Sequence, residues 1–218
     1  MHPDEDWPAY FAAGAGRRAH PDLIAAAERC GAPGRAVDLG AGDGTESRWL
    51  LARGWRVHAV DGTPGLRERI LAGLADPGPR LCAVDALFGQ LHALPRARLV
   101  YAGFALPFAS PAELTALLGF VRAALEPGGV FAAHFLAERD DWRRRPGVQV
   151  QDEGRLRLLL RGLQIESIQE REYDAGSGTG PKHWHLRFVL ARRPPGPGGP
   201  AVSGSSGAGG ALRSRSPS

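Results

Sequence analysis

The feature that most constrains the fold of this 218-residue chain is an apolar run that enters a glycine-rich turn. Residues 36–46 read Ala-Val-Asp-Leu-Gly-Ala-Gly-Asp-Gly-Thr-Glu. Glycine in such a turn lets the backbone bend sharply and approach a ligand closely. A second apolar run at 57–60 ends on Asp61. The succession of strand, turn, helix, strand and carboxylate predicts a nucleoside-cofactor site in a doubly wound sheet.

The acidic residues around the turn discriminate between cofactors. The dinucleotide fingerprint G-x-G-x-x-G places a pyrophosphate at a helix N-terminus, whereas this chain spaces its glycines at 40, 42 and 44. Asp38 and Glu46 would repel a pyrophosphate but suit the ammonium and sulfonium groups of S-adenosylmethionine. Asp61 would accept hydrogen bonds from both ribose hydroxyls. The turn therefore favours S-adenosylmethionine over a nicotinamide dinucleotide.

The turn resembles the glycine motif of the class I S-adenosylmethionine-dependent methyltransferases, and the resemblance covers roughly residues 10–191. Val60-Asp61 is similar to the acid of the family's second strand, Val84-Asp85-Ala86 to its adenine-contacting third strand, and residues 125–130 to its turn into strand five. The resemblance implies that the cofactor is S-adenosylmethionine. It implies contacts to that cofactor from Asp38, Gly40, Ala41, Gly42, Glu46, Asp61, Gly62, Asp85 and Ala86.

Hydrophobic periodicity and turn residues predict an α/β fold. We expect strands at 36–39, 56–60, 81–84, 98–101, 130–135, 164–171 and 184–191. We expect helices at 21–31, 44–53, 64–74, 111–125 and 152–162. The glycine-rich segment 173–181 is predicted to be a hairpin loop. The resemblance implies a Rossmann-like seven-stranded sheet in the order 3-2-1-4-5-7-6, with the last strand antiparallel and helices on both faces.

Three regions follow from composition. Residues 1–30 are expected to form an N-terminal cap and helix, and residues 31–193 the methyltransferase domain. Residues 194–218 are rich in Gly, Pro and Ser. They are predicted to be disordered, because few apolar groups are available to offset the entropy of ordering.

The composition argues against a membrane protein or a nucleic-acid-binding protein. No apolar run is long enough to cross a membrane, and the acidic N-terminus lacks the pattern of a signal peptide, so a cytoplasmic protein is expected. The formal charge is +4, but the arginines are spread along the chain without interleaved aromatic residues. Two cysteines, Cys30 and Cys82, provide no disulfide framework and are expected to be small core residues.

The methyl acceptor is expected at the carboxyl end of the fourth strand, beside the topological switch point. Residues 101–108 there read Tyr-Ala-Gly-Phe-Ala-Leu-Pro-Phe. They offer no side-chain amide or carboxylate to hold an exocyclic amine, which argues against a base-flipping methyltransferase. The segment instead suits a small or soft acceptor. Phe104 is predicted to line the site and to contact the cofactor, whereas Phe108 is either a site residue or a core aromatic.

Three segments resemble small bacterial methyltransferases of the tellurite-resistance type. They are the N-terminal segment 10–21, the segment 104–108, and the last strand with its lead-in at 181–193. The resemblance implies that an arginine of the cap, Arg17 or Arg18, pairs with the cofactor carboxylate through a bidentate fork.

Several alternatives remain open. His183 and His185 would face one side of a strand, so a metal site with His134 is conceivable, as are an edge-strand pair and a general-base role for one histidine. We assign neither a metal nor a catalytic residue. Asp140 and Asp141 are predicted to be a solvated loop. A protein that binds S-adenosylmethionine without transferring its methyl group is the alternative to an enzyme, and the oligomeric state is open.

Overall fold

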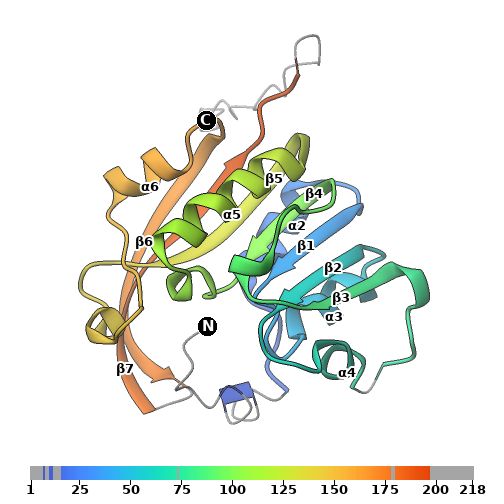
Figure 1. Cartoon of the computed structure of the whole chain (residues 1–218), viewed down its shortest axis with the longest axis horizontal. Helices are drawn as coiled ribbons and strands as arrows, with labels where there is room; N and C mark the ends of the chain where they lie inside the picture. The colour runs from blue at the N-terminus through green and yellow to red at the C-terminus, as the bar shows by residue number, and fades with distance from the viewer. Residues whose placement is uncertain (1–6, 8–9, 12–15, 73, 178–179, 197–218) are drawn as a thin grey trace, which may run out of the picture.

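The computed structural model describes residues 7, 10–11, 16–72, 74–177 and 180–196. Its seven strands form one sheet in the order β3-β2-β1-β4-β5-β7-β6, as predicted (Figure 1). Strands β1 to β5 run parallel, and β7 is antiparallel to both β5 and β6. The strands are β1 (Arg35–Leu39), β2 (Arg56–Asp61), β3 (Leu81–Asp85), β4 (Ala97–Ala102), β5 (Leu125–Leu136), β6 (Gln164–Ser177) and β7 (Gly180–Arg192).

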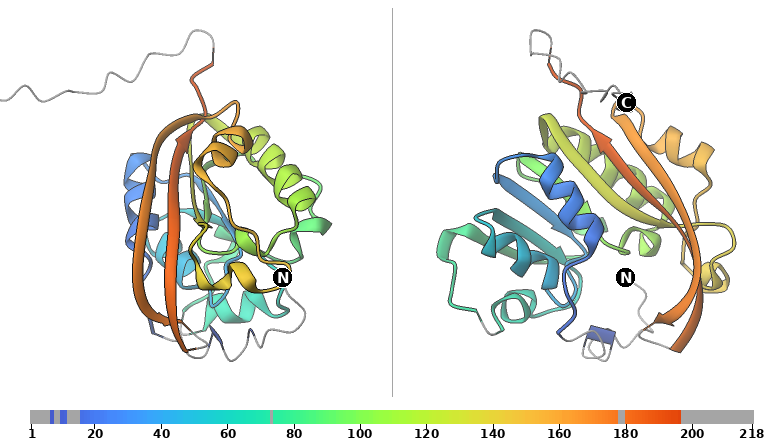
Figure 2. Two further views of the ribbon diagram at one scale, coloured as in Figure 1. Left: turned by 90° about the vertical axis from the view of Figure 1, so that its left-hand side faces the viewer. Right: turned by 180° about the vertical axis from the view of Figure 1, so that it is seen from behind.

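Helices cover both faces of the sheet, as the edge-on view in Figure 2 shows. The helices are α2 (Pro21–Arg29), α3 (Thr45–Ala52), α4 (Leu66–Leu71), α5 (Pro111–Ala124) and α6 (Glu153–Leu159). Residues of α2, α3 and α4 pack into one apolar core with the sheet, and residues of α5 and α6 into a second. Short 3-10 turns occupy Gly78–Arg80, Phe88–Gln90, Leu106–Phe108 and Asp141–Arg144.

The longest helix illustrates how local sequence sets these boundaries. Ser110 caps α5 by accepting a hydrogen bond from the Glu113 backbone N–H, and the Glu113 side chain accepts one from the Ser110 N–H. Pro111 occupies the first turn, where its missing N–H costs nothing. This reciprocal cap fixes the start of the helix immediately after the segment that leaves β4.

The hairpin of β6 and β7 is longer than predicted. The segment 173–181 was expected to be a loop, but pairing continues to Ser177 and resumes at Gly180. Cross-strand charge pairs explain the extension, because His183 on β7 hydrogen-bonds to both Asp174 and Glu172 on β6. The tip of this hairpin consequently reaches the end of the molecule where the parallel strands terminate (Figures 1 and 2).

Three other expectations have different outcomes. Cys30 is half-buried against the core, but Cys82 is exposed on the edge strand β3, so its prediction as a core residue is wrong. The disordered tail predicted for 194–218 lies almost wholly outside the described residues, as does part of the predicted cap. None of the described helices is long and apolar enough to span a bilayer.

Candidate functional site

A cavity of about 560 Å³ opens at the carboxyl ends of the parallel strands. Its volume lies within the usual range for small-molecule sites. Of the eleven residues predicted to contact the cofactor, ten line it, whereas Asp85 does not. The ten are Arg17, Asp38, Gly40, Ala41, Gly42, Glu46, Asp61, Gly62, Ala86 and Phe104.

The glycine turn brings main chain to the cavity wall. Gly40 has φ 72°, and a Cβ there would lie 2.1 Å from the Cβ of Ala105. The backbone N–H groups of Gly40 and Ala41 donate to the carbonyl of Val60, which ties the turn to β2. Any larger residue at 40 would therefore force the turn away from β4.

Asp61 stands at the end of β2 and faces this turn. One carboxylate oxygen accepts a hydrogen bond from the Gly42 N–H at 2.9 Å, and the other accepts one from the Thr63 N–H at 2.8 Å. Arg69 contacts the second oxygen at 3.4 Å. A carboxylate has about four lone-pair positions, and three are taken, so the oxygen that accepts from Gly42 retains capacity for one further hydrogen bond.

Asp38, at the end of β1, is almost wholly buried. Its carboxylate accepts a 2.7 Å hydrogen bond from the Ser47 hydroxyl. Burial, reinforced by the nearby charge of Glu46, raises the pKa of Asp38 to about 7. A cation placed beside Asp38 would favour its charged form.

Arg17 is joined to two carboxylates at the start of α3. Its Nε and Nη2 donate to the two oxygens of Asp43 at 3.1 and 3.0 Å, and its Nη1 donates to Glu46 at 2.6 Å. Glu46, which is predicted to attract the ammonium group of the cofactor, and Arg17, which is predicted to bind its carboxylate, are thus paired with each other in this structure. Because two carboxylates share one guanidinium, this end of the cavity keeps negative charge.

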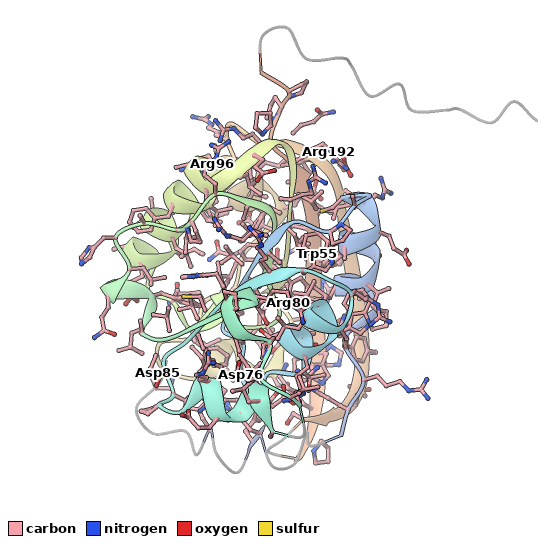
Figure 3. All side chains as sticks on the ribbon, turned by 90° about the vertical axis from the view of Figure 1, so that its right-hand side faces the viewer. Trp55, Asp76, Arg80, Asp85, Arg96 and Arg192 are labelled. Atoms are coloured by element: carbon pink, nitrogen blue, oxygen red, sulfur yellow. The ribbon has the colours of Figure 1, made fainter. Side chains whose placement is uncertain are left out.

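Asp85 is not among the residues that line the cavity. Its two oxygens accept hydrogen bonds from the Gly65 and Leu66 N–H groups at the start of α4, at 2.9 and 3.0 Å. These bonds lower the pKa of Asp85. Figure 3 shows Asp85 beside α4, at the end of the molecule opposite Arg96 and Arg192. In this arrangement its next neighbour Ala86, rather than the Asp85 carboxylate, contributes to the cavity wall.

Phe104 lies at the turn that leaves β4 and has φ 59°, a conformation that is strained for an aromatic residue. Its ring stacks on His134, with centroids 4.1 Å apart. Nε2 of His134 lies 2.8 Å from Asp22, whose carboxylate also accepts two hydrogen bonds from Arg171. A buried polar network from α2, β5 and β6 therefore holds Phe104 in place.

Sequence reasoning identified only part of the wall opposite the glycine turn, namely Phe104 and, as one of two alternatives, Phe108. We name this wall the aromatic chamber; its members all line the cavity, and they are Trp7, Tyr10, Phe104, Phe108, Trp142 and Trp184. Neighbouring rings contact each other, with centroids 5.2 Å apart for Trp7–Phe108 and 5.4 Å for Trp142–Trp184. The hairpin residues Tyr173 and Ala175 to Ser177 also line the cavity. The high aromatic content of 7–11 was the available signal.

The prediction of a solvated loop at 140–141 holds for Asp141, which is exposed, but is wrong for Asp140. Asp140 is fully buried and lies 2.7 Å from the ammonium of Lys182. Burial lowers the pKa of Lys182, and the hydrogen bond to Asp140 opposes that shift. The ammonium also lies over the Trp184 ring, 3.3 Å from its centroid. The ion pair between Lys182 and Asp140 therefore holds β7 in place behind the aromatic chamber.

The histidines considered as metal ligands lie apart. His183 bridges Glu172 and Asp174 on the exposed hairpin, whereas His185 is buried against Glu170. His134 instead neighbours His20 and Asp22, whose ligand atoms lie within 4.8 Å of one another. The guanidinium of Arg171 already holds both oxygens of Asp22, and its positive charge disfavours a cation there.

The residues at the glycine turn fit S-adenosylmethionine. The backbone of Gly40 and Gly42 lines the cavity, and Asp61 has acceptor capacity for a ribose hydroxyl. Asp38 and Glu46 supply negative charge for a cationic ligand. Ala86, Leu87 and Phe88 add an apolar surface suited to a base.

Comparisons with known proteins agree. Residues 36–129 match a family model described as a methyltransferase domain. A malonyl-[acyl-carrier protein] O-methyltransferase of Halorhodospira halophila is 32% identical over 150 residues, covering 66% of this chain and 48% of the relative. The chain therefore spans about half the length of this curated relative.

Solved structures share the fold. TehB from Haemophilus influenzae superposes with a TM-score of 0.68 at 16% identity, covering 86% of this chain and 67% of TehB. The 1,6-didemethyltoxoflavin-N1-methyltransferase of Burkholderia thailandensis, solved with its acceptor and S-adenosylhomocysteine, superposes with a TM-score of 0.63 at 21% identity, covering 87% and 81%. Together these findings show that residues 36–129 match a methyltransferase domain and that the chain has the Rossmann-like methyltransferase fold, with S-adenosylmethionine indicated as its cofactor.

Proposed function

We propose that this protein is an enzyme that transfers the methyl group of S-adenosylmethionine to a small-molecule acceptor by in-line displacement. The observation that carries the proposal is the continuity of the cavity. One wall contains the glycine turn and Asp61, and the other contains the aromatic chamber. A cofactor on the first wall would present its methyl group to an acceptor on the second, which is the proximity that such a transfer requires.

Each wall has a distinct chemical task. The cofactor brings the reactive methyl group and its own leaving group, so the protein needs to bind, orient and exclude water. Asp61 would hold the ribose, and Ala86 would lie against the base. Asp38 and Glu46 would balance positive charge. Arg17 would contact the cofactor carboxylate by exchanging one of its present carboxylate partners.

The character of the cavity supports a small-molecule acceptor. The carboxyl end of β4 carries Gly103 and Phe104 in place of an amide or carboxylate that would grip an exocyclic amine of a flipped base. The Burkholderia thailandensis enzyme of similar fold binds 1,6-didemethyltoxoflavin, a small molecule. The cytoplasmic location expected from the sequence belongs to this proposal as well.

The test has two stages. Calorimetric titration with S-adenosylhomocysteine, with NAD as the control, measures cofactor binding. Incubation with S-adenosylmethionine and a panel of small acceptors then measures S-adenosylhomocysteine production. Turnover of at least one acceptor supports an enzyme. Tight cofactor binding without product from a broad panel would favour the non-catalytic binding protein, and binding of NAD alone would overturn both.

A further inference from the structure

The aromatic chamber and the glycine turn differ sharply in charge. Four carboxylates line the cavity, all on the wall that contains the glycine turn; they belong to Asp38, Asp43, Glu46 and Asp61. Among the described residues that line the cavity, Arg17 is the one guanidinium or ammonium, and it is engaged by Asp43 and Glu46. An anionic acceptor in the chamber would therefore find no available cation.

A cationic acceptor is disfavoured for a different reason. The ammonium of Lys182 lies 3.3 Å from the Trp184 ring centroid and 4.5 Å from that of Trp142, and Arg145 lies 4.4 Å from the latter. These rings already interact with positive charge, so they offer less to a second cation. The sulfonium of the cofactor would also repel a cation brought into methyl-transfer range.

Two of the hydrogen-bond donors at the site lie beside His134, where the turn after β4 approaches β5. Nδ1 of His20 accepts the Asp22 backbone N–H at 3.2 Å. Burial, with the neighbouring His134, lowers the pKa of His20 to about 4. A neutral ring that accepts at Nδ1 carries its proton on Nε2, so His20 is a donor at that nitrogen rather than a base. Its ring contacts Phe104 of the chamber, with centroids 5.5 Å apart.

Tyr101 is the second donor. It lines the cavity at the end of β4, yet its residue is only 1% exposed. Its hydroxyl has no hydrogen-bond partner among the described residues, an arrangement that is costly in a buried polar group. Burial and the charges of Glu46 and Asp38 raise the pKa of Tyr101, so it keeps its proton. His20 and Tyr101 both pack edge-on against His134, so both lie beside the same ring.

We propose that the methyl acceptor is an uncharged, planar aromatic compound that bears a hydrogen-bond acceptor atom, with its ring in the aromatic chamber and that atom facing His20 and Tyr101. The ring would stack on or pack edge-to-face against the chamber walls. The acceptor atom would satisfy the Tyr101 hydroxyl. This inference rests on the proposed function and specifies its substrate class.

Four probes of one ring size test the inference. Quinoline is uncharged and has a ring nitrogen, naphthalene lacks that nitrogen, N-methylquinolinium is a cation, and naphthalene-2-carboxylate is an anion. Equilibrium dialysis against the protein saturated with S-adenosylhomocysteine, near pH 7.5, measures the affinity of each. Quinoline should bind about tenfold more tightly than the other three. Equal binding of naphthalene, or tightest binding of either charged probe, would overturn the inference.

Variants locate the donors. His20→Phe and Tyr101→Phe each remove a donor and keep a ring, so each should weaken quinoline binding several-fold and leave naphthalene binding unchanged. Tyr173→Phe is the matched control, because Tyr173 also lines the cavity but lies on the exposed hairpin. Should either donor variant fold poorly, the wild-type probe series decides alone.

The two proposals fail differently. Binding of S-adenosylhomocysteine without binding of any ring probe would refute the substrate class and leave the proposed function standing. Failure to bind S-adenosylhomocysteine would refute the proposed function, and the substrate class with it.

Discussion

The ring of Phe104 lies nearly parallel to the imidazole of His134, with an angle of 8° between the two planes. Burial lowers the pKa of His134, so the ring is neutral and its Nε2 donates to Asp22. The strained backbone at the end of β4 is thus supported by a side chain of β5, which in turn depends on Asp22 at the start of α2. The wall that contains the glycine turn meets the aromatic chamber at Phe104.

Loss of the Asp22 charge should destabilise the protein. Asp22→Asn weakens the hydrogen bonds from Arg171 and His134, and we expect the free energy of unfolding to fall by about 1.5–3 kcal/mol, the range for bonds to charged groups. Urea denaturation measures it. Asp76→Asn is the control, since Asp76 pairs with Arg67 on the surface and its replacement should leave the unfolding midpoint unchanged. Equal effects of both substitutions would contradict the role given to Asp22.

Asp61 should contribute to cofactor affinity. Asp61→Ala removes the carboxylate that faces the glycine turn and frees the Gly42 N–H, and we expect binding of S-adenosylhomocysteine to weaken by about 1–3 kcal/mol. Calorimetric titration gives the dissociation constant. An unchanged constant would remove Asp61 from the cofactor site.

Asp85 provides a comparison at the neighbouring strand. Its carboxylate caps the start of α4, so Asp85→Asn should lower the melting temperature slightly and leave the dissociation constant for S-adenosylhomocysteine unchanged. The resemblance to the family predicts the reverse, a loss of cofactor affinity. The same titration therefore decides between the cap that the structure shows and a direct contact with adenine.

The raised pKa of Asp38 makes stability depend on pH. Between about pH 4 and pH 7 the folded protein keeps a proton on Asp38 that the unfolded chain has released. The contribution of Asp38 to stability therefore falls as pH rises through this window and stays low above pH 7. Ligand-free Asp38→Asn protein should melt above wild type at pH 8 and near it at pH 4. A constant difference in melting temperature between the two proteins from pH 4 to pH 8 would refute the raised pKa of Asp38.

Cofactor binding should follow the same ionisation. Charged Asp38 attracts a cationic ligand, so the affinity for S-adenosylmethionine relative to uncharged-sulfur S-adenosylhomocysteine should rise between pH 6 and pH 8 in wild type. In Asp38→Asn protein that ratio should stay flat. Calorimetric titration of both ligands at each pH checks this, and a rising ratio in the variant would assign the ionisation to another group.

Lys182 should contribute strongly to the free energy of unfolding. Lys182→Met leaves the Asp140 carboxylate buried without its cation, which typically costs about 3–5 kcal/mol. A second substitution, Asp140→Asn, should restore part of this loss. Arg157→Met is the control, because Arg157 pairs with Glu153 on an exposed helix face. A double variant no more stable than the single one would contradict the pairing.

The part of the site formed by residues that lie near one another in the sequence could be predicted. The glycine turn and Asp61 follow one another along the chain, and both lie where the pattern placed them. Lys182 and Asp140 are separated by 42 positions, so nothing local marked that pair as buried. The hydrogen bonds of Asp85 could not be predicted for the same reason, because the N–H groups that hold its carboxylate belong to Gly65 and Leu66 of another segment.

The length of the hairpin of β6 and β7 was underestimated because the glycine-rich composition of 173–181 predicts a loop. The interactions that extend the two strands lie between them and are not visible in one segment of sequence. Gly176 and Gly180 favour a turn locally, but each paired position gains from a partner on the opposite strand. His183 could be recognised as a strand residue only once Asp174 and Glu172 were known to lie across from it. Strand ends defined by such pairs are not encoded in one segment.

The aromatic chamber has a consequence for how this protein could diversify. Its rings come from the N-terminal segment, the turn after β4, the turn after β5 and the hairpin, whereas the opposite wall is built at the ends of β1, β2 and β3 around the backbone of the glycine turn. Exchanging a single ring would reshape the space for the acceptor while the backbone that grips the cofactor stays as it is. Change in substrate and retention of chemistry are thereby assigned to separate parts of the chain.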